Sequence, residues 1–125
     1  MAKRWYERHP QRLWAEQAIM KGSFPQFVLR EADGRLFWEG ILVTNFGTHY
    51  KARIIYGRNH PYEKPSLRVV RPEIRNDSPH RFADGTLCIY PDRYDYKRWT
   101  APASVPLLAS WLALYEVWVR TGKWS

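Results

Sequence analysis

Four short strand-like stretches joined by tight turns occupy the middle of this chain, and they restrict its fold more than any other feature. The stretches cover residues 27–30, 36–44, 48–56 and 66–70. Asp33-Gly34 separates the first two, and this dipeptide is typical of a two-residue hairpin turn. Because sequential strands with short connections pair with their neighbours, the sequence predicts a four-stranded antiparallel meander.

A helix is expected before these strands and another after them. The first covers residues 9–22, with a proline in its first turn and a glycine at its end. The second covers about residues 104–121, with Ser104 as its N-cap and Gly122 closing its end. Its apolar residues recur at three- and four-residue steps, which is typical of a helix that packs on a sheet.

The composition fits one domain, residues 1–125. Hydrophobic residues make up 45% of the chain and aromatic residues 16%, which is enough for one core but not for two. We recognise no run of about 18 uncharged apolar residues, the length that a membrane span needs. The sequence therefore predicts a soluble, cytoplasmic protein that makes no membrane contact. Its expected fold class is α+β, with an N-terminal helix, a four-stranded antiparallel meander sheet, a long active-site loop and a C-terminal helix.

The charge balance is basic, with 20 Lys and Arg against 12 Asp and Glu and a formal net charge of +8. Such a balance favours an acidic partner protein, a nucleic acid or an acidic lipid surface. The positive residues are scattered along the chain, and no helix-turn-helix, zinc-finger or RNA-binding signature is recognised. Nucleic-acid binding therefore rests on charge alone and predicts steeply salt-dependent affinity. We expect no specific nucleic acid as a partner.

Cys88 is the only cysteine, which excludes an internal disulfide and a zinc site with several cysteines. The four histidines show no short metal-ligand spacing, so neither a metal nor a cofactor is expected. By composition alone, a lone cysteine is more often an inert packed residue than a nucleophile. Cys88, however, lies in the middle of an irregular stretch of about thirty residues, from Arg71 to Pro102. A loop of that length inside a compact domain is usually functional.

The order of these elements, with a lone cysteine in a long loop after the fourth strand, resembles the ubiquitin-conjugating fold. That family has a Tyr-Pro-Phe-x-Pro-Pro-like segment before its fourth strand, and residues 60–65 here read His-Pro-Tyr-Glu-Lys-Pro. The family then has His-Pro-Asn, a short flap and Gly-x-Ile-Cys-Leu. Residues 78–89 here read Ser-Pro-His-Arg-Phe-Ala-Asp-Gly-Thr-Leu-Cys-Ile, so that His80 stands where the family has its asparagine.

The chain is more closely similar to the compact bacterial members of this superfamily, which are found beside ubiquitin-activating-like enzymes and in antiviral operons. These members have a motif like His-x-Tyr/Phe-x-Asp-Gly-x-Leu-Cys-Leu-Tyr-x-Pro. Residues 80–91 here resemble it and read His-Arg-Phe-Ala-Asp-Gly-Thr-Leu-Cys-Ile-Tyr-Pro. It continues in Trp99, in Trp111 with Tyr-Glu-Val-Trp at residues 115–118, and in Thr-Gly-Lys-Trp at residues 121–124. The resemblance spans essentially the whole chain.

This resemblance implies a cysteine transferase in bacterial antiphage defence. Cys88 is expected to accept the C-terminus of a ubiquitin-like protein or of a cyclic-oligonucleotide synthase as a thioester and to pass it to a lysine of a target protein. Where the cargo is a ubiquitin-like protein, a separate activating-enzyme-like protein is a further expected partner. The alternative is a binding module with the same fold, in which Cys88 is incidental and no transfer takes place.

His80 and Cys88 are the expected catalytic residues. A thiolate is intrinsically nucleophilic, and its thioester stays reactive toward amines. The imidazole of His80 could donate to the oxyanion or take a proton from the incoming amine. It could also only hydrogen-bond the loop backbone.

Four further residues around the cysteine are expected to contribute to substrate binding. Asp84 and Gly85 should form the turn that presents Cys88, with Gly85 in a conformation that other residues resist. Tyr90 and Pro91 should shape a groove for the extended tail of the cargo, although Tyr90 could instead be a core aromatic.

Three residues later in the loop have weaker assignments. Asp92 and Asp95 could orient or deprotonate an acceptor lysine. The simpler interpretation is that they are solvated loop carboxylates among basic residues, with no role in catalysis. Trp99 is expected to be structural and to close the loop onto the last helix.

Overall fold

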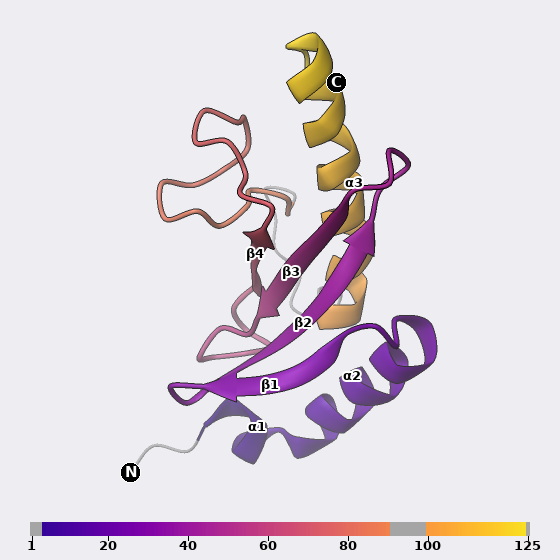
Figure 1. Ribbon diagram of the computed structural model, residues 1–125. Helices are drawn as coiled ribbons and strands as arrows, with labels where there is room; N and C mark the ends of the chain where they lie inside the picture. The colour runs from indigo at the N-terminus through magenta and orange to yellow at the C-terminus, as the bar shows by residue number, and fades with distance from the viewer. Residues whose placement is uncertain (1–3, 91–99, 125) are drawn as a thin grey trace.

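The computed structural model describes residues 4–90 and 100–124 and confirms the predicted α+β architecture (Figure 1). The elements are, in chain order, α1 (Trp5–Arg8), α2 (Pro10–Ser23), β1 (Val28–Ala32), β2 (Arg35–Val43), β3 (His49–Ile55), β4 (Ser66–Arg71) and α3 (Ala101–Thr121). The short helix α1 was not expected from the sequence. This fold is that of a compact ubiquitin-conjugating-like protein.

The sheet is the predicted antiparallel meander, with strand order β1-β2-β3-β4. In this register Trp38 of β2 lies opposite Ile54 of β3, which in turn lies opposite Leu67 of β4. The hairpin between β1 and β2 turns at Asp33 and Gly34, whose φ angles are 52° and 76°. Positive φ at both central residues is what a two-residue hairpin turn requires, so the dipeptide explains the turn.

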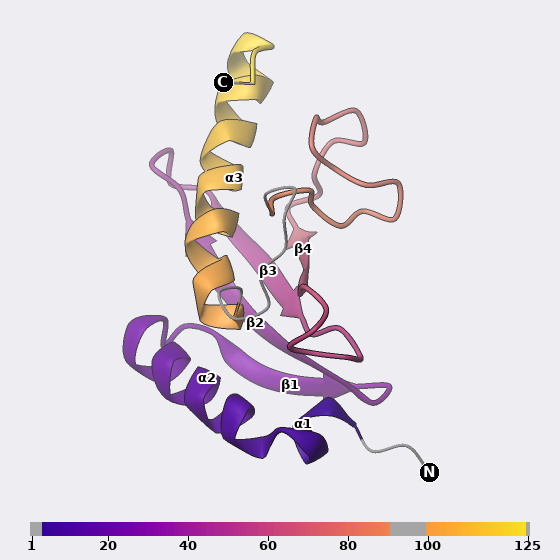
Figure 2. The ribbon, with the colours of Figure 1, turned by 180° about the vertical axis from the view of Figure 1, so that it is seen from behind.

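The two long helices pack differently on this sheet. In Figures 1 and 2, α3 covers one face of the sheet, and α2 runs beside β1 and beneath the first turn of α3. The core between the sheet and the helices consists of fully buried apolar side chains. Its members include Met20, Ile54, Leu67, Leu108 and Leu112.

Helix α3 begins earlier than predicted. Thr100, in extended backbone, is the N-cap, and its side-chain oxygen accepts a hydrogen bond of 3.1 Å from the backbone N–H of Ala103. The assignment of Ser104 as N-cap was wrong, because its hydroxyl donates to the carbonyl of Thr100 at 2.8 Å from inside the first turn. The predicted end is confirmed, since Gly122 closes the helix in left-handed conformation with φ of 76°.

Helix α3 is also long and apolar enough to cross a membrane, by length and composition alone. Glu116 is the only charged residue between positions 101 and 119, so the helix reaches this limit without containing a run of about 18 uncharged apolar residues. Its face with Leu108 and Leu112 is, however, buried against the sheet. This packing is typical of a helix in the core of a folded domain.

A buried carboxylate joins the two long helices. Glu16 of α2 is 1% exposed, and its Oε1 accepts hydrogen bonds from the backbone N–H of Ala101 at 2.6 Å and from the hydroxyl of Tyr56 at 3.1 Å. Its Oε2 lies 2.7 Å from Nε2 of His60 and 2.8 Å from Nε of Arg12. Glu16 thus fixes the start of α3 relative to α2 and the end of β3.

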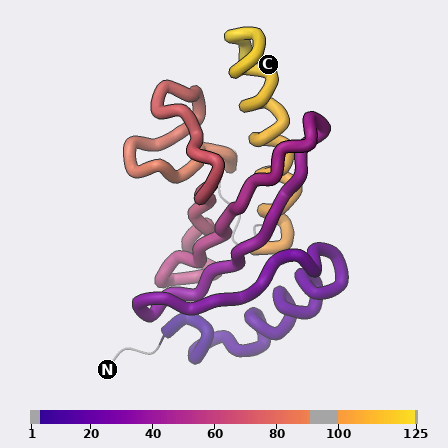
Figure 3. The backbone as a smooth tube through the Cα atoms, viewed as in Figure 1, coloured from indigo at the N-terminus to yellow at the C-terminus, as the bar shows by residue number. Residues whose placement is uncertain are grey.

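The segment after β4 leaves the sheet and turns twice before the chain returns towards α3 (Figure 3). Between residues 72 and 90 it contains no helix and no strand, only an isolated antiparallel bridge between Arg81 and Leu87. The long loop predicted around Cys88 is therefore present in this described part.

Candidate active site

The chain approaches Cys88 through a tight turn at residues 82–86. The backbone N–H of Phe82 donates to the carbonyl of Thr86 at 2.8 Å, and the N–H of Gly85 donates to the carbonyl of Phe82 at 3.0 Å. Gly85 has φ of 90°, a conformation that a side chain disfavours. The structure thus places Asp84 and Gly85 at the turn that leads to the cysteine.

The carboxylate of Asp84 stabilises this turn from within. Its Oδ1 accepts hydrogen bonds from the backbone N–H of Thr86 at 2.9 Å and from the hydroxyl of Thr86 at 2.6 Å. These bonds from Thr86 lower the pKa of Asp84 below its ordinary value. Asp84 is exposed and does not line the pocket that contains Cys88. Its contacts are those of a turn-forming residue.

Strand β4 holds the turn in place. The guanidinium Nη2 of Arg68 donates to the carbonyl of Asp84 at 2.7 Å, and the backbone N–H of Leu87 donates to the carbonyl of Leu67 at 2.9 Å. The side chain of Leu87 is buried. The residue directly before Cys88 is therefore anchored to the sheet, although it lies in an irregular segment.

Cys88 is exposed and is tied by its backbone to His80. The N–H of Cys88 donates to the carbonyl of His80 at 2.9 Å, and the indole Nε1 of Trp111 donates to the same oxygen at 3.1 Å. His80 has φ of 54°, in the left-handed region. This local backbone conformation is uncommon for residues other than glycine, although Asn, Asp and His adopt it more often than the rest.

His80 and Cys88 line the same open pocket, of about 210 Å³, against α3. The pocket's other lining residues are Ile89, Leu107, Ser110, Trp111, Leu114 and Trp124. The imidazole of His80 lies 5.1 Å from the ring of Trp124, which lies 5.2 Å from the ring of Trp111. The thiol is thus at the edge of a mostly apolar pocket in which the polar side chains are those of His80, Ser110 and Cys88 itself.

Tyr90 is half-buried against the core, and its hydroxyl is 2.7 Å from Oγ of Ser104. Its ring also lies 5.8 Å from Nζ of Lys64. Tyr90 is not among the residues that line the pocket around Cys88. It joins the end of the loop to the first turn of α3.

Four predicted residues of the loop, Pro91, Asp92, Asp95 and Trp99, lie outside the described residues. Their expected roles stay predictions. Sequence reasoning missed Ser110, which sits on α3 at a position where nothing in the helical pattern distinguishes it. It also missed Arg68, whose contact with Asp84 crosses from a strand to the loop. Trp124 belonged to the motif noted at the C-terminus, but its place in this pocket was not foreseen.

A family comparison agrees with this geometry. Residues 16–125 match the family model described as Type II CBASS E2 protein. The chain belongs to this family. The matched range contains Glu16, the whole sheet, the turn before Cys88 and α3. Neither a curated protein nor a solved structure gives a significant match.

Membership in the Type II CBASS E2 family identifies a compact bacterial protein of antiphage defence with an E2-like role in conjugation. It confirms the resemblance noted from the motif at residues 80–91.

Proposed function

We propose that this E2 protein carries the C-terminus of a partner protein as a thioester on Sγ of Cys88 and transfers it to an amine of a target. The observation that carries the proposal is the placement of an exposed thiol and an imidazole in one pocket. The partner would be a ubiquitin-like protein or a cyclic-oligonucleotide synthase, whose C-terminus would reach Cys88 as an acyl adenylate, with AMP as leaving group, or as a thioester on an activating-enzyme-like protein, with that protein's thiolate as leaving group. The reaction would take place in the bacterial cytoplasm.

In the loading step, the thiolate of Cys88 attacks the carbonyl carbon of an activated C-terminus. A sulfur–carbon bond forms, and the bond between that carbon and its leaving group breaks. Apolar surface from Leu107, Leu114 and Trp124 lines the pocket next to the thiol. It favours an extended tail whose last side chains are small or apolar, because charged side chains would lose their hydration there.

In the transfer step, a lysine amine attacks the thioester carbon, and the tetrahedral intermediate expels the Cys88 thiolate to leave an amide. The negative charge on the intermediate's oxygen needs hydrogen-bond donors. The backbone N–H of Cys88 is already donated to His80, and the indole N–H of Trp111 is donated to the same carbonyl. Among the described residues that line the pocket, the imidazole of His80, the hydroxyl of Ser110 and the indole N–H of Trp124 then remain as candidate side-chain donors.

His80 could contribute in a second way, as acceptor of the proton that the attacking amine must lose. Both roles require only that the imidazole reach the bond being made at Sγ of Cys88. The shared pocket supports this requirement. The binding-module alternative requires neither the exposure of the thiol nor a polar group beside it.

The experiment is to purify the protein with its genomic neighbours and to compare gels run with and without reductant. We expect an adduct that reductant removes, that is absent in Cys88→Ala and that becomes resistant to reductant in Cys88→Ser, because an ester replaces the thioester. A thiol that resists alkylation, with no adduct to any neighbour, would favour the binding module.

A further inference from the structure

A second pocket, separate from the one around Cys88, has four arginines among the residues that line it. It has a volume of about 350 Å³ and lies between α1, the β1–β2 turn and the segment after β3. We call it the arginine pocket, and it is lined by Arg4, Arg8, Arg35 and Arg58 together with aromatic, polar and apolar residues of the same three segments. It shares no lining residue with the pocket around Cys88.

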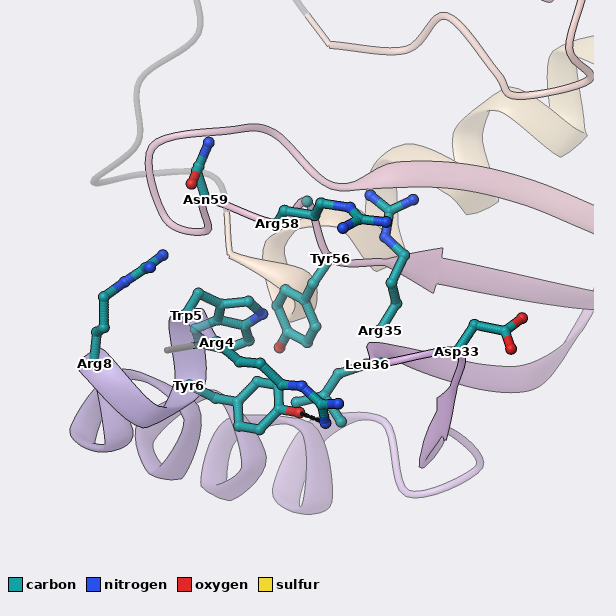
Figure 4. Close-up of a pocket in the computed structure, with 12 residues that line it drawn as sticks. Arg4, Trp5, Tyr6, Arg8, Asp33, Arg35, Leu36, Tyr56, Arg58 and Asn59 are labelled. Atoms are coloured by element: carbon teal, nitrogen blue, oxygen red, sulfur yellow. Dashed lines mark hydrogen bonds between the residues drawn. The ribbon is translucent and has the colours of Figure 1, made fainter. Parts of the chain in front are cut away.

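Two of these arginines, Arg35 and Arg58, form no ion pair with a described residue, although the carboxylate of Asp33 lines the same pocket. Arg4 is paired, since its Nη1 lies 2.8 Å from Oε1 of Glu31 and donates to the hydroxyl of Tyr6. Arg35 and Arg58 are exposed, and neither has an ion pair with any residue in the described ranges. In Figure 4 their guanidinium groups extend towards the same side of the pocket. Like charges brought together in a concave site raise the local potential for an anion.

The floor of the pocket adds an unused donor. Trp5 is 3% exposed, and its indole Nε1 has no hydrogen-bond partner within residues 4–90 and 100–124. In Figure 4 this nitrogen points inward among the lining side chains, towards Tyr56. A buried donor without an acceptor costs free energy, and an anionic oxygen that reached it would recover that cost.

The donor set favours phosphate over other anions. The positive side chains that line the pocket are all arginines, whose planar guanidinium forks match phosphate oxygens in pairs. A doubly charged phosphate can satisfy Arg35 and Arg58 together, whereas one carboxylate carries a single charge.

The space favours an organic phosphate. The pocket is much larger than a phosphate ion and falls in the range typical of small-molecule sites. Asn59 and Asp33 also line the pocket. The amide of Asn59 can donate to or accept from the edge of a ligand's base, and the carboxylate of Asp33 can accept from a ligand's hydroxyl groups. Leu36 and Tyr6 supply apolar surface.

We propose that the arginine pocket binds a phosphate-bearing small molecule of nucleotide size, with Arg35 and Arg58 holding the phosphate. The site is separate from Cys88, so the proposal stands whether or not that thiol carries an acyl group. An acidic segment of a partner protein is the competing occupant, and the test below distinguishes the two.

The test is calorimetric titration of the full chain with adenosine 5′-monophosphate, inorganic phosphate, adenosine and a glutamate-rich peptide. We expect the nucleotide to bind more tightly than any of the other three. Arg35→Gln combined with Arg58→Gln should weaken nucleotide binding by about tenfold or more, since it removes two charge-assisted contacts. Lys21→Gln combined with Arg71→Gln is the matched control, because both residues are exposed, lie outside the pocket and carry the same total charge.

The control should leave nucleotide affinity within about twofold, because its charges are distant and screened by salt. Equal weakening in the two double variants would show attraction by net charge and would overturn the proposal. So would tighter binding of the peptide, binding of inorganic phosphate as tight as that of the nucleotide, or no binding of any probe. If the double variant fails to unfold cooperatively, the single variants Arg35→Gln and Arg58→Gln carry the same comparison.

Discussion

The backbone N–H of Cys88 donates a hydrogen bond of 2.9 Å to the carbonyl oxygen of His80. This contact closes the loop between the two residues and brings both side chains to the same pocket. It also uses the one backbone donor nearest to the thiol. The side-chain donors that line the pocket are therefore the candidates for the oxyanion that substitution can test.

The first prediction concerns the side chain of His80. His80→Ala should leave loading of Cys88 largely intact and slow discharge to amine by about tenfold to a hundredfold, because a donor or proton acceptor is lost. His80→Asn is the matched variant, since asparagine tolerates the left-handed conformation and keeps a donor. It should recover part of the rate. Single-turnover discharge to free lysine measures both, and equal rates in all three proteins would remove His80 from the mechanism.

The second prediction concerns the hydroxyl of Ser110. Ser110→Ala should slow discharge by about tenfold if this hydroxyl stabilises the oxyanion, and it should leave stability nearly unchanged because the residue is exposed. Ala109→Ser is a useful control, since it adds a hydroxyl one position away, at a residue that does not line the pocket around Cys88. An unchanged rate in Ser110→Ala would leave His80 and Trp124 as the candidate side-chain donors.

The third prediction concerns Trp111, a positioning residue. Trp111→Phe removes the indole N–H that donates to the carbonyl of His80 and should cost about 1 kcal/mol of unfolding free energy. Discharge should slow while loading changes little, because His80 is less firmly held. Trp118→Phe, outside the pocket, should not slow discharge. Urea unfolding and single-turnover rates together check this, and a slower rate in Trp118→Phe alone would contradict it.

The fourth prediction concerns the turn before Cys88. Gly85→Ala should destabilise the protein by about 1 kcal/mol, because φ of 90° disfavours a side chain and the new Cβ would lie 2.7 Å from Nη1 of Arg68. Gly22→Ala, near the end of α2 with nothing within 4 Å of the added Cβ, should be neutral or slightly stabilising. Urea unfolding of both variants measures the contrast, and the same sign in both would contradict it.

The fifth prediction concerns Glu16 and acid. Burial raises the pKa of Glu16. The contacts with His60, the N–H of Ala101 and Arg12 together lower it by more than burial raises it, so the net shift of this pKa is downward. A carboxyl with a depressed folded-state pKa contributes stability above its unfolded value of 4.5, and this contribution is lost as the pH falls through the folded value.

Glu16→Gln should therefore cost about 3 kcal/mol near neutral pH and should flatten the loss of stability on acidification. Glu7→Gln is the control for a change of charge, because the side chain of Glu7 is exposed and its glutamine counterpart can still accept from the backbone N–H of Arg4. Urea midpoints measured from neutral to acidic pH check this. An acid limb that is as steep in Glu16→Gln as in the unchanged protein would contradict it.

The sheet could be predicted because its signals are local. Asp33 and Gly34 form the turn that their residue types favour. Gly122 ends α3 because glycine adopts the left-handed conformation that closes a helix. The start of α3 was misjudged because Ser104 and Thr100 are both good capping residues. What decided between them was the extended backbone at Thr100, together with the contact of Ala101 with Glu16, 85 residues away in the chain.

The candidate site was predictable in its residues but not in its contacts. The motif around Cys88 located the thiol, His80 and the turn at Asp84 and Gly85. The bonds that hold them come from elsewhere: Arg68 on β4 and Trp111 on α3. Such contacts depend on how strands and helices pack, and no spacing along the sequence encodes them. The arginine pocket was hidden for the same reason, since its arginines are scattered in the sequence.

The most direct test of the central claim is to map the adduct's linkage by mass spectrometry after digestion without reductant. The account predicts a cross-linked peptide in which the C-terminal carboxyl of the partner is joined to Cys88, lighter than the two separate peptides by one water molecule. Free amine should then release it. A linkage mapped to a lysine of this chain, with Cys88 recovered as a free thiol throughout, would contradict the account.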